Sequence, residues 1–352
     1  MPATLVPKDR IPWVHLLLIG WMPGPLKRIV YRLRGYRLGR RVRFGPFGVV
    51  VGRDVALGDD VAIGAFAIVR GRRIRIGRHS SVGTFSYVAC EDIEIGEDAK
   101  IREQVFVGGP QLPESRFVLG SRTIVLQMAY INPTKPVTIG DDTGIGGHCL
   151  IFTHGSWLNA LDGYPVTFQP VTLGKSVWLP WRVFIMPGVT IGDGTVIGAD
   201  SLVTGDIPPY CLAMGSPARV VRRAPEFPRQ LSGSNQAAIM SEIMETFDRY
   251  LEYSGVSISV VGERRTYKGA GRRGWNLRWV RTENEHVAAT PDPGDTVLTE
   301  VPLDAETRAQ YRSKGVFWLD VAGRTRSAAG SPVTEELATF LGRYGVRLHR
   351  QG

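Results

Sequence analysis

His154 is the residue whose type and setting best suit proton-transfer chemistry. It lies in the segment FTHG at 152–155, where a regular repeat of aliphatic residues breaks off before it resumes at Leu173. A neutral imidazole, with an ordinary pKa of about 6.5, can take a proton from a hydroxyl whose oxygen attacks a carbonyl. Functional residues concentrate on loops held by a rigid scaffold. We therefore predict that His154 is a general base; the alternative is a solvated loop histidine.

Three further residues are candidates for contact with a substrate: His148, Trp157 and Tyr164. His148 stands at the same phase of the repeat as His154, so we expect both imidazoles to project outward from successive strands of one coil. His148 also fits a surface histidine at a position that tolerates any polar residue. Trp157 and Tyr164 lie in the loop that His154 opens.

A catalytic imidazole is usually oriented by a carboxylate or a carbonyl at its second nitrogen. Asp141, Asp142 and Asp162 are near His154 in sequence, and their spacing does not choose among them. Cys149 occupies a small-residue position of the repeat, which predicts a core thiol rather than a nucleophile. Cys90, Cys149 and Cys211 have neither disulfide nor metal spacing, and without a secretory signal they indicate reduced thiols in a cytoplasmic protein.

The repeat that surrounds these residues places an aliphatic side chain at every sixth position. Its runs extend from Val51 to Val203, and the longest unbroken one contains Leu173, Leu179, Ile185, Ile191, Ile197 and Val203. A six-residue period is neither helical nor alternating, so it predicts a solenoid whose coil has three short strands and about 18 residues. We expect the small residues near the corners to let the chain turn. An antiparallel sandwich would not hold this phase.

Residues 170–223 carry a resemblance to a known family. They contain PGVTIG, IGADSLV, DIPP and GSPAR, and they resemble the hexapeptide-repeat acyltransferases, in particular the sugar O-acetyltransferase branch. The resemblance implies a left-handed parallel β-helix, a homotrimer and acetyl-coenzyme A as co-substrate. The hand is implied by the family alone, since parallel crossovers are ordinarily right-handed.

The resemblance also implies roles for individual residues. His154 stands where the family has its catalytic histidine. Ala199 and Thr204 match positions that contact the coenzyme, and Arg219 and Arg222 match basic positions near its nucleotide phosphates. Guanidinium groups suit phosphate geometry, although the two arginines also fit a solvated basic tail.

This sequence departs from the family pattern at two places next to these positions. Gly205 replaces the lysine that the family has after the threonine. The common Trp-Ile-Gly is replaced by Trp178-Leu179-Pro180, followed by a bulky Trp181.

The charge of the chain is concentrated at its N-terminus. The net charge is +10, and residues 1–43 hold ten basic residues against the single acid Asp9. A nucleic-acid enzyme more often distributes its basic face over a folded domain, so we expect no nucleic-acid partner. The apolar stretch at 11–22, with Trp13 and Trp21, is shorter than the roughly 20 residues that span a bilayer. It suits the surface of an anionic membrane, or an amphipathic helix packed on its own domain.

We divide the chain into a basic amphipathic segment at 1–41, a β-helix domain at 42–224, a linker and helix at 225–255, and a domain at 256–352. Helical spacing predicts helices at 236–253, 304–313 and 334–344. Strand-like runs stand at 256–261, 274–280, 296–301 and 316–321. The predicted fold is therefore mainly β, a parallel β-helix followed by a small α+β domain of unknown role.

These features favour an acyl-coenzyme-A-dependent O-acyltransferase that acetylates a saccharide or glycan precursor in surface polysaccharide synthesis. Transfer is direct and needs no metal. We expect it in the cytoplasm, with contact at the inner face of the membrane through its N-terminus. One alternative is a trimeric scaffold without catalysis. Another is a γ-type carbonic anhydrase, whose zinc ligands here would be His79, His148 and His154.

Overall fold

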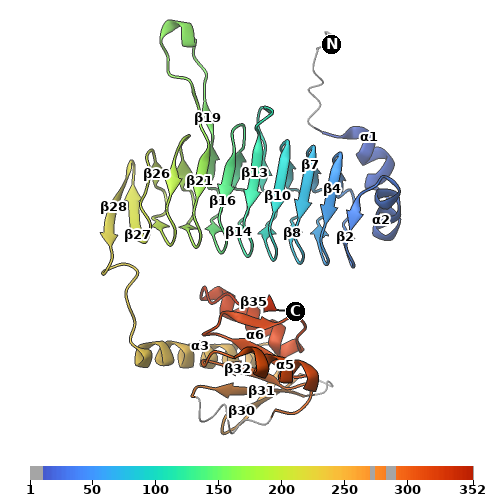
Figure 1. Cartoon of the computed structure of the whole chain (residues 1–352), viewed down its shortest axis with the longest axis vertical. Helices are drawn as coiled ribbons and strands as arrows, with labels where there is room; N and C mark the ends of the chain where they lie inside the picture. The colour runs from blue at the N-terminus through green and yellow to red at the C-terminus, as the bar shows by residue number, and fades with distance from the viewer. Residues whose placement is uncertain (1–10, 270–273, 283–290, 352) are drawn as a thin grey trace. The chain divides into compact units, whose positions relative to one another are not determined.

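The computed structural model describes residues 11–269, 274–282 and 291–351 (Figure 1). They belong to two compact units, 1–230 and 231–352. Lys8, Asp9 and Arg10 of the basic N-terminal segment lie outside the described residues. Within those ranges, no helix has the length and hydropathy needed to cross a membrane.

The first unit begins with helices that cover one end of a solenoid (Figure 1). They are α1 at Trp13–His15, a π-helical turn η1 at Leu16–Gly20, and α2 at Gly24–Leu33. Proline near the first position favours the start of α2, because its missing N–H would have no partner there anyway. Lys27 and Tyr31 of α2 are buried against the first coil.

Three sheets form the faces of the solenoid. The first contains β1 Arg37–Leu38, β4 Asp54–Leu57, β7 Arg73–Ile76, β10 Asp92–Ile95, β13 Arg116–Leu119, β16 Val137–Ile139, β21 Val171–Leu173 and β24 Thr190–Ile191. The second contains β2 Arg43–Phe44, β5 Ala62–Ile63, β8 Ser81–Val82, β11 Lys100–Ile101, β14 Ile124–Val125, β17 Gly144–Ile145, β22 Trp178–Leu179, β25 Val196–Ile197, β27 Cys211–Gly215 and β28 Ala218–Arg223. The third contains β3 Val49–Val51, β6 Ile68–Arg70, β9 Tyr87–Ala89, β12 Phe106–Val107, β15 Tyr130–Asn132, β18 Leu150–Phe152, β23 Phe184–Ile185 and β26 Leu202–Val203. Neighbouring strands are parallel, except that β27 and β28 form an antiparallel pair.

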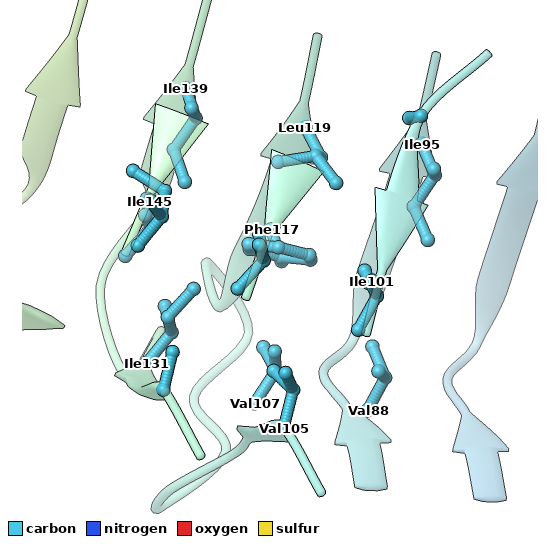
Figure 2. Close-up of a cluster of buried hydrophobic side chains, with 14 of the residues drawn as sticks. Val88, Ile95, Ile101, Val105, Val107, Phe117, Leu119, Ile131, Ile139 and Ile145 are labelled. Carbon is cyan, nitrogen blue, oxygen red and sulfur yellow. The ribbon is translucent and has the colours of Figure 1, made fainter. Parts of the chain in front are cut away.

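The six-residue repeat forms the core, as the sequence predicted. From Leu57 to Val203 every aliphatic residue of the repeat is at most 3% exposed. Figure 2 shows several of them, among them Ile95, Ile101 and Ile139, pointing into the space that the strands enclose. Val51 is the exception: it is half-buried, while Val50 beside it is fully buried.

The length of a coil differs from the expected 18 residues over part of the solenoid. Asp54 pairs with Arg73 and Arg73 with Asp92, so these coils take 19 residues. Near the C-terminal end Thr172 pairs with Thr190, which gives 18. A coil can therefore contain one residue more than 18 and still keep its inward-facing aliphatic side chains.

The corners are built differently from the prediction. Small residues such as Ser80 and Thr143 do not make the turns; they are buried, and their hydroxyls bond to the backbone of the next coil. The Thr143 hydroxyl donates to the Gly174 carbonyl (2.9 Å) and accepts from the Val177 amide (3.1 Å). The residue before each small one turns the chain: Asp142 and His79, for example, have φ of 57° and 59°. Such a left-handed conformation costs an ordinary residue roughly 1 kcal/mol.

The second unit contains a seven-stranded sheet in the order β29, β30, β31, β32, β33, β34, β35 within its described residues. The strands are β29 Ser257–Val261, β30 Arg264–Lys268, β31 Trp275–Val280, β32 Thr296–Thr299, β33 Phe317–Asp320, β34 Thr325–Ser327 and β35 His349–Gln351. Helices α3 Gly233–Tyr253 and α6 Pro332–Arg343 share one core with the sheet, and α5 Ala305–Lys314 contributes to another. Each helix and strand expected in this part has a counterpart, while β30, β34 and β35 were missed.

The helix predicted at 236–253, within the linker and helix at 225–255, is α3, and it belongs to the second unit rather than to a linker. Met240, Ile243, Met244, Phe247 and Leu251 of α3 are buried in the core that α3 shares with α6 and the sheet. The compact second unit accordingly starts at Leu231.

Candidate active site

A hairpin interrupts the solenoid between β18 and β21 and carries His154. Its strands are β19 His154–Gly155 and β20 Thr167–Phe168, paired antiparallel so that His154 stands opposite Phe168. After the hairpin, Val171 pairs with Val137 and the solenoid continues in register. Figure 1 shows this hairpin projecting from the body of the solenoid beyond β19.

The His154 imidazole is half-buried between aromatic rings. It stacks on Phe168, with ring centroids 5.6 Å apart and planes 15° apart, and its centroid is 6.5 Å from that of Phe152. Nδ1 is enclosed and has no hydrogen-bond partner within the described residues. The ring therefore presents Nε2 to any ligand that approaches. The sequence did not single out either phenylalanine, because neither carries a motif.

A buried polar network fixes the backbone immediately before His154. The Thr153 hydroxyl donates to the Asn132 carbonyl (2.7 Å) and accepts from the Lys135 amide (2.9 Å). The Asn132 side-chain oxygen accepts from the Thr134 hydroxyl at 2.7 Å. The Gln169 amide donates to the Thr153 carbonyl (2.9 Å), which closes the base of the hairpin. The network holds the hairpin base on the preceding coil, and the sequence analysis missed it.

None of the three aspartates near His154 in sequence is bonded to its Nδ1. Asp141 accepts from the Ser121 amide, and Asp142 pairs with Arg122 at 2.8 Å. Asp141 also lines a separate groove of about 760 Å³ along the first sheet. Asp162 is exposed in a short 3₁₀ turn at Ala160–Asp162 in the hairpin.

The other histidine of this region has a different setting from the one expected. His148 lies in the turn between β17 and β18, with φ of 56°, rather than in a strand. Its exposed ring is tilted against Trp181, with centroids 5.8 Å apart. Trp181 in turn lies over Gly147, where a Cβ would come within 2.3 Å of the indole. Gly147 therefore allows the bulky Trp181 that departs from the family pattern.

The remaining hairpin candidates lie on its surface. Trp157 is 96% exposed and Tyr164 49% exposed, and Leu161 between them is 94% exposed.

Cys149 is a core residue. It is fully buried, its thiol donates to the Pro180 carbonyl at 2.8 Å, and burial raises its pKa to about 11. A thiol attacks as thiolate, so this environment suits packing rather than catalysis.

The residues expected to hold the coenzyme lie on the last coils. Ala199 is exposed in the turn after β25, and Thr204 is exposed directly after β26. Arg219 pairs across the antiparallel ladder with Met214, and Arg222 pairs with Leu212. Residues three apart in a strand ordinarily face opposite ways.

A bulge between Leu212 and Ala213 changes that orientation. Leu212 and Met214 flank the buried Ala213, so they share the outer face of β27. Directly opposed residues share a face, and Arg219 and Arg222 therefore both lie on this outer face. The bulge thus brings two exposed guanidinium groups to one side of the sheet.

The proposed zinc ligands do not meet within one chain. His79 lies 3.5 Å from Asp60 at a corner of an early coil. In the described part of the chain, no group of three His, Cys, Asp or Glu side chains is placed to hold a metal ion.

Comparison with curated proteins finds acetyltransferases. Galactoside O-acetyltransferase of Escherichia coli (strain K12) is 45% identical over 96 residues, covering 24% of this chain and 43% of the relative. A proposed acetyltransferase of Staphylococcus aureus (strain MRSA252) is 54% identical over 54 residues, covering 15% of this chain and 27% of the relative. The chain thus spans less than half the length of these curated relatives. No family model matches the chain.

Solved structures of similar proteins include two coenzyme complexes. A hexapeptide-repeat acetyltransferase of Vibrio cholerae with acetyl-coenzyme A is 27% identical, with 42% of this chain and 69% of that chain covered and a TM-score of 0.30. Galactoside acetyltransferase with coenzyme A is 28% identical, with 38% and 65% covered and a TM-score of 0.28. The match to galactoside O-acetyltransferase confirms the resemblance to the sugar O-acetyltransferases.

Proposed function

We propose that this protein is an acyl-coenzyme-A-dependent O-acyltransferase that moves an acetyl group to a hydroxyl of a saccharide or glycan precursor. The observation that carries the proposal is the setting of His154, a half-buried imidazole at the base of the hairpin that interrupts the solenoid. The similarity to galactoside O-acetyltransferase supports both the reaction and the class of acceptor.

In the proposed reaction His154 acts as the general base. Nε2 takes the proton of the acceptor hydroxyl while its oxygen forms a bond to the thioester carbonyl carbon. The tetrahedral intermediate then collapses, the carbon–sulfur bond breaks, and the coenzyme leaves as a thiolate that takes up the proton. A thiol with an ordinary pKa of about 8.5 leaves with little acid assistance. Stacking on Phe168 restricts the imidazole to one plane throughout.

The donor would bind along the last coils. Arg219 and Arg222 would hold its phosphates, because their shared face allows two guanidinium groups to engage one nucleotide. The exposed Ala199 and Thr204 would contact the pantetheine arm.

We further propose that the chain works as a homotrimer of left-handed coils. Two observations support a contribution from a second copy. Nδ1 of His154 has no partner within the described residues of one chain. Trp157 and Leu161 of the hairpin expose almost their whole surface, which is unfavourable unless another surface covers them.

The test is an assay of acetyl transfer to a panel of galactosides and oligosaccharides. The transfer is measured through the free thiol of coenzyme A that it releases. His154→Ala should lower kcat by a factor on the order of 10²–10⁴, the usual contribution of a general base. Its binding of acetyl-coenzyme A, measured by calorimetry, should remain. Arg219→Ala/Arg222→Ala should instead weaken that binding.

His148→Ala is the matched control, because this exposed turn histidine touches Trp181 rather than His154. Absence of acyl-coenzyme A binding by the wild-type chain would refute the proposal, as would full activity of His154→Ala. Absence of acyl-coenzyme A binding would favour the scaffold hypothesis, whereas full activity of His154→Ala would mean that another group is the base. Light scattering tests the trimer, whose mass should be three times that of the chain.

A further inference from the structure

The helices at the N-terminal end of the first unit expose apolar side chains in a regular pattern. Along α1, η1 and the residue after them, the exposed positions are Trp13, Val14, Leu17, Leu18 and Trp21, each between 57% and 71% exposed. They recur at intervals of three and four, so they form one stripe on a helical surface. Ile19 and Gly20 are buried on the opposite side. We call these five residues the first stripe.

Helix α2 buries a lysine and a tyrosine against the solenoid and turns several of its aliphatic residues away from it. Lys27 is fully buried, and its ammonium donates to the Gly45 carbonyl (2.8 Å) and the Gly48 carbonyl (3.1 Å). Tyr31, one turn later, is also fully buried, and its hydroxyl accepts from the Val50 amide (3.1 Å). These contacts fix which face of α2 meets the solenoid.

The opposite face of α2 carries Leu26, Ile29 and Leu33, which are 42%, 54% and 83% exposed. We call these three residues the second stripe. A helix packed only on its own domain would turn such residues inward. Figure 1 shows that α1 and α2 lie together at the same end of the solenoid.

Positive charge accompanies both stripes. Residues 11–43 contain eight basic residues and no acidic one. Some of the arginines are neutralised by the first coils, as Arg40 is by Asp59. Arg28, Arg32 and Arg34, on α2 or just after it, make no ion pair within the described residues. Arg28 and Arg32 lie beside the second stripe on α2, so cationic and apolar groups are neighbours on this helix.

We propose that this outer surface of α1, η1 and α2 binds the surface of an anionic lipid bilayer. The two stripes would enter the boundary between headgroups and acyl chains, Trp13 and Trp21 would lie at headgroup level, and the arginines would contact lipid phosphates. The helices would lie in the plane of the membrane, in agreement with the absence of a membrane-crossing helix from the described residues. The proposal does not depend on the transferase reaction.

The charge distribution disfavours a second copy of the chain as the occupant. Two such surfaces facing each other would bring unpaired arginines of both copies together, and no acidic residue of 11–43 would offset them. An anionic lipid surface offers opposite charge to the arginines and apolar depth to the stripes.

The experiment is flotation of the full-length protein with vesicles. The wild-type chain should float with vesicles that contain phosphatidylglycerol and much less with phosphatidylcholine alone. Leu17→Asp/Ile29→Asp should weaken binding at least about tenfold, because it places a carboxylate in each stripe. Arg28→Ala/Arg32→Ala should weaken it about thirtyfold at low salt, since each arginine contributes about a factor of five near an anionic surface.

Matched controls come from the second unit. Tyr253→Asp/Val261→Asp alters two exposed apolar residues there, and Arg312→Ala/Lys314→Ala removes two exposed charges. Both should float like the wild type. Acetyl-coenzyme A binding and circular dichroism report on folding of every variant.

Three outcomes would overturn the proposal: no flotation of the wild type, full flotation of Leu17→Asp/Ile29→Asp, or an equal loss in the control variants. If the wild type does not bind vesicles and Leu17→Asp/Ile29→Asp lowers the mass measured by light scattering, this surface binds another copy of the chain. Failure of acetyl transfer alone would leave this result unaffected.

Discussion

At the scale of single residues, burial rather than residue type decides which groups can react. Burial raises the pKa of the Cys149 thiol to about 11 and that of Cys90 to about 12. Because only the thiolate is nucleophilic, we expect neither thiol to react with iodoacetamide in the folded protein at pH 8. Both should react once urea unfolds the chain. Mass spectrometry of the labelled peptides measures this directly.

The same shifts predict the effect of alkaline pH. A thiol with a raised pKa is kept neutral by folding, so stability is lost as the pH rises above the ordinary thiol value of about 8.5. Cys149→Ala should remove part of that loss and leave acetyl transfer intact. Rapid native labelling of Cys149, or loss of activity in Cys149→Ala that other core variants do not show, would contradict this assignment.

At the scale of elements, the repeat predicted the solenoid because an aliphatic residue at every sixth position puts one inward side chain on each strand. These side chains stack on those of the next coil. Leu173, Ile185 and Ile197 are all buried as expected. The corners could not be predicted in the same way. Residues with positive φ are recognised in a sequence when they are glycines, and here His148 and Arg182 adopt that conformation. The prediction placed His148 in a strand for that reason.

The site could be predicted only in part, for a similar reason. His154 was found because it breaks the repeat. Phe168 faces it only through hairpin pairing, and Asn132 supports Thr153 from the preceding coil. Contacts between residues so far apart in sequence depend on coil length and hairpin register, which the six-residue spacing does not specify.

Helix α2 offers a test of how an element is held. Lys27 counts as one of many basic residues in the sequence, yet its ammonium bonds two backbone carbonyls, and burial lowers its pKa. Lys27→Ala removes both bonds, and we expect a loss of about 2 kcal/mol of local stability. Hydrogen exchange, read at the amide of Val50 beneath Tyr31, measures this in the first unit alone.

Arg28→Ala is the control for that variant, because its side chain makes no ion pair within the described residues and its loss should change exchange very little. Lys27→Met keeps the volume and should be less damaging than alanine. Equal protection in Lys27→Ala and the wild type would show that the lysine does not hold α2 on the solenoid.

At the scale of the whole molecule, the net charge is positive, yet many arginines form ion pairs with carboxylates of neighbouring coils. Carboxylates of the first unit meet arginines one coil away, as in Asp59 with Arg40 and Asp200 with Arg182. The pKa of each of these carboxyls is lowered, chiefly by hydrogen bonds from its arginine and, at Asp59, first from the Arg40 backbone amide. An exposed pair of this kind contributes little to stability by itself, so the effect of these pairs lies in their repetition along the solenoid.

The repetition predicts acid sensitivity. A carboxyl whose pKa is lowered by folding stabilises the protein above its unfolded value of about 3.9, and this stability is lost as the pH falls through the folded value. Protonation also leaves the arginines of neighbouring coils unopposed. We therefore expect the first unit to become less stable at pH values below about 4, with a lower melting temperature. Calorimetry or hydrogen exchange measures this loss.

Asp92 is the best single test, because it accepts hydrogen bonds from Arg73, lies 3.6 Å from Arg116, and is only 17% exposed. Arg73, first through its hydrogen bonds, lowers the pKa of this carboxyl. Asp92→Asn should cost roughly 0.5–1 kcal/mol at pH 7. The difference from the wild type should vanish in acid, once the wild-type carboxyl is also neutral. A difference that persists unchanged at low pH would mean that Asp92 acts through packing rather than charge.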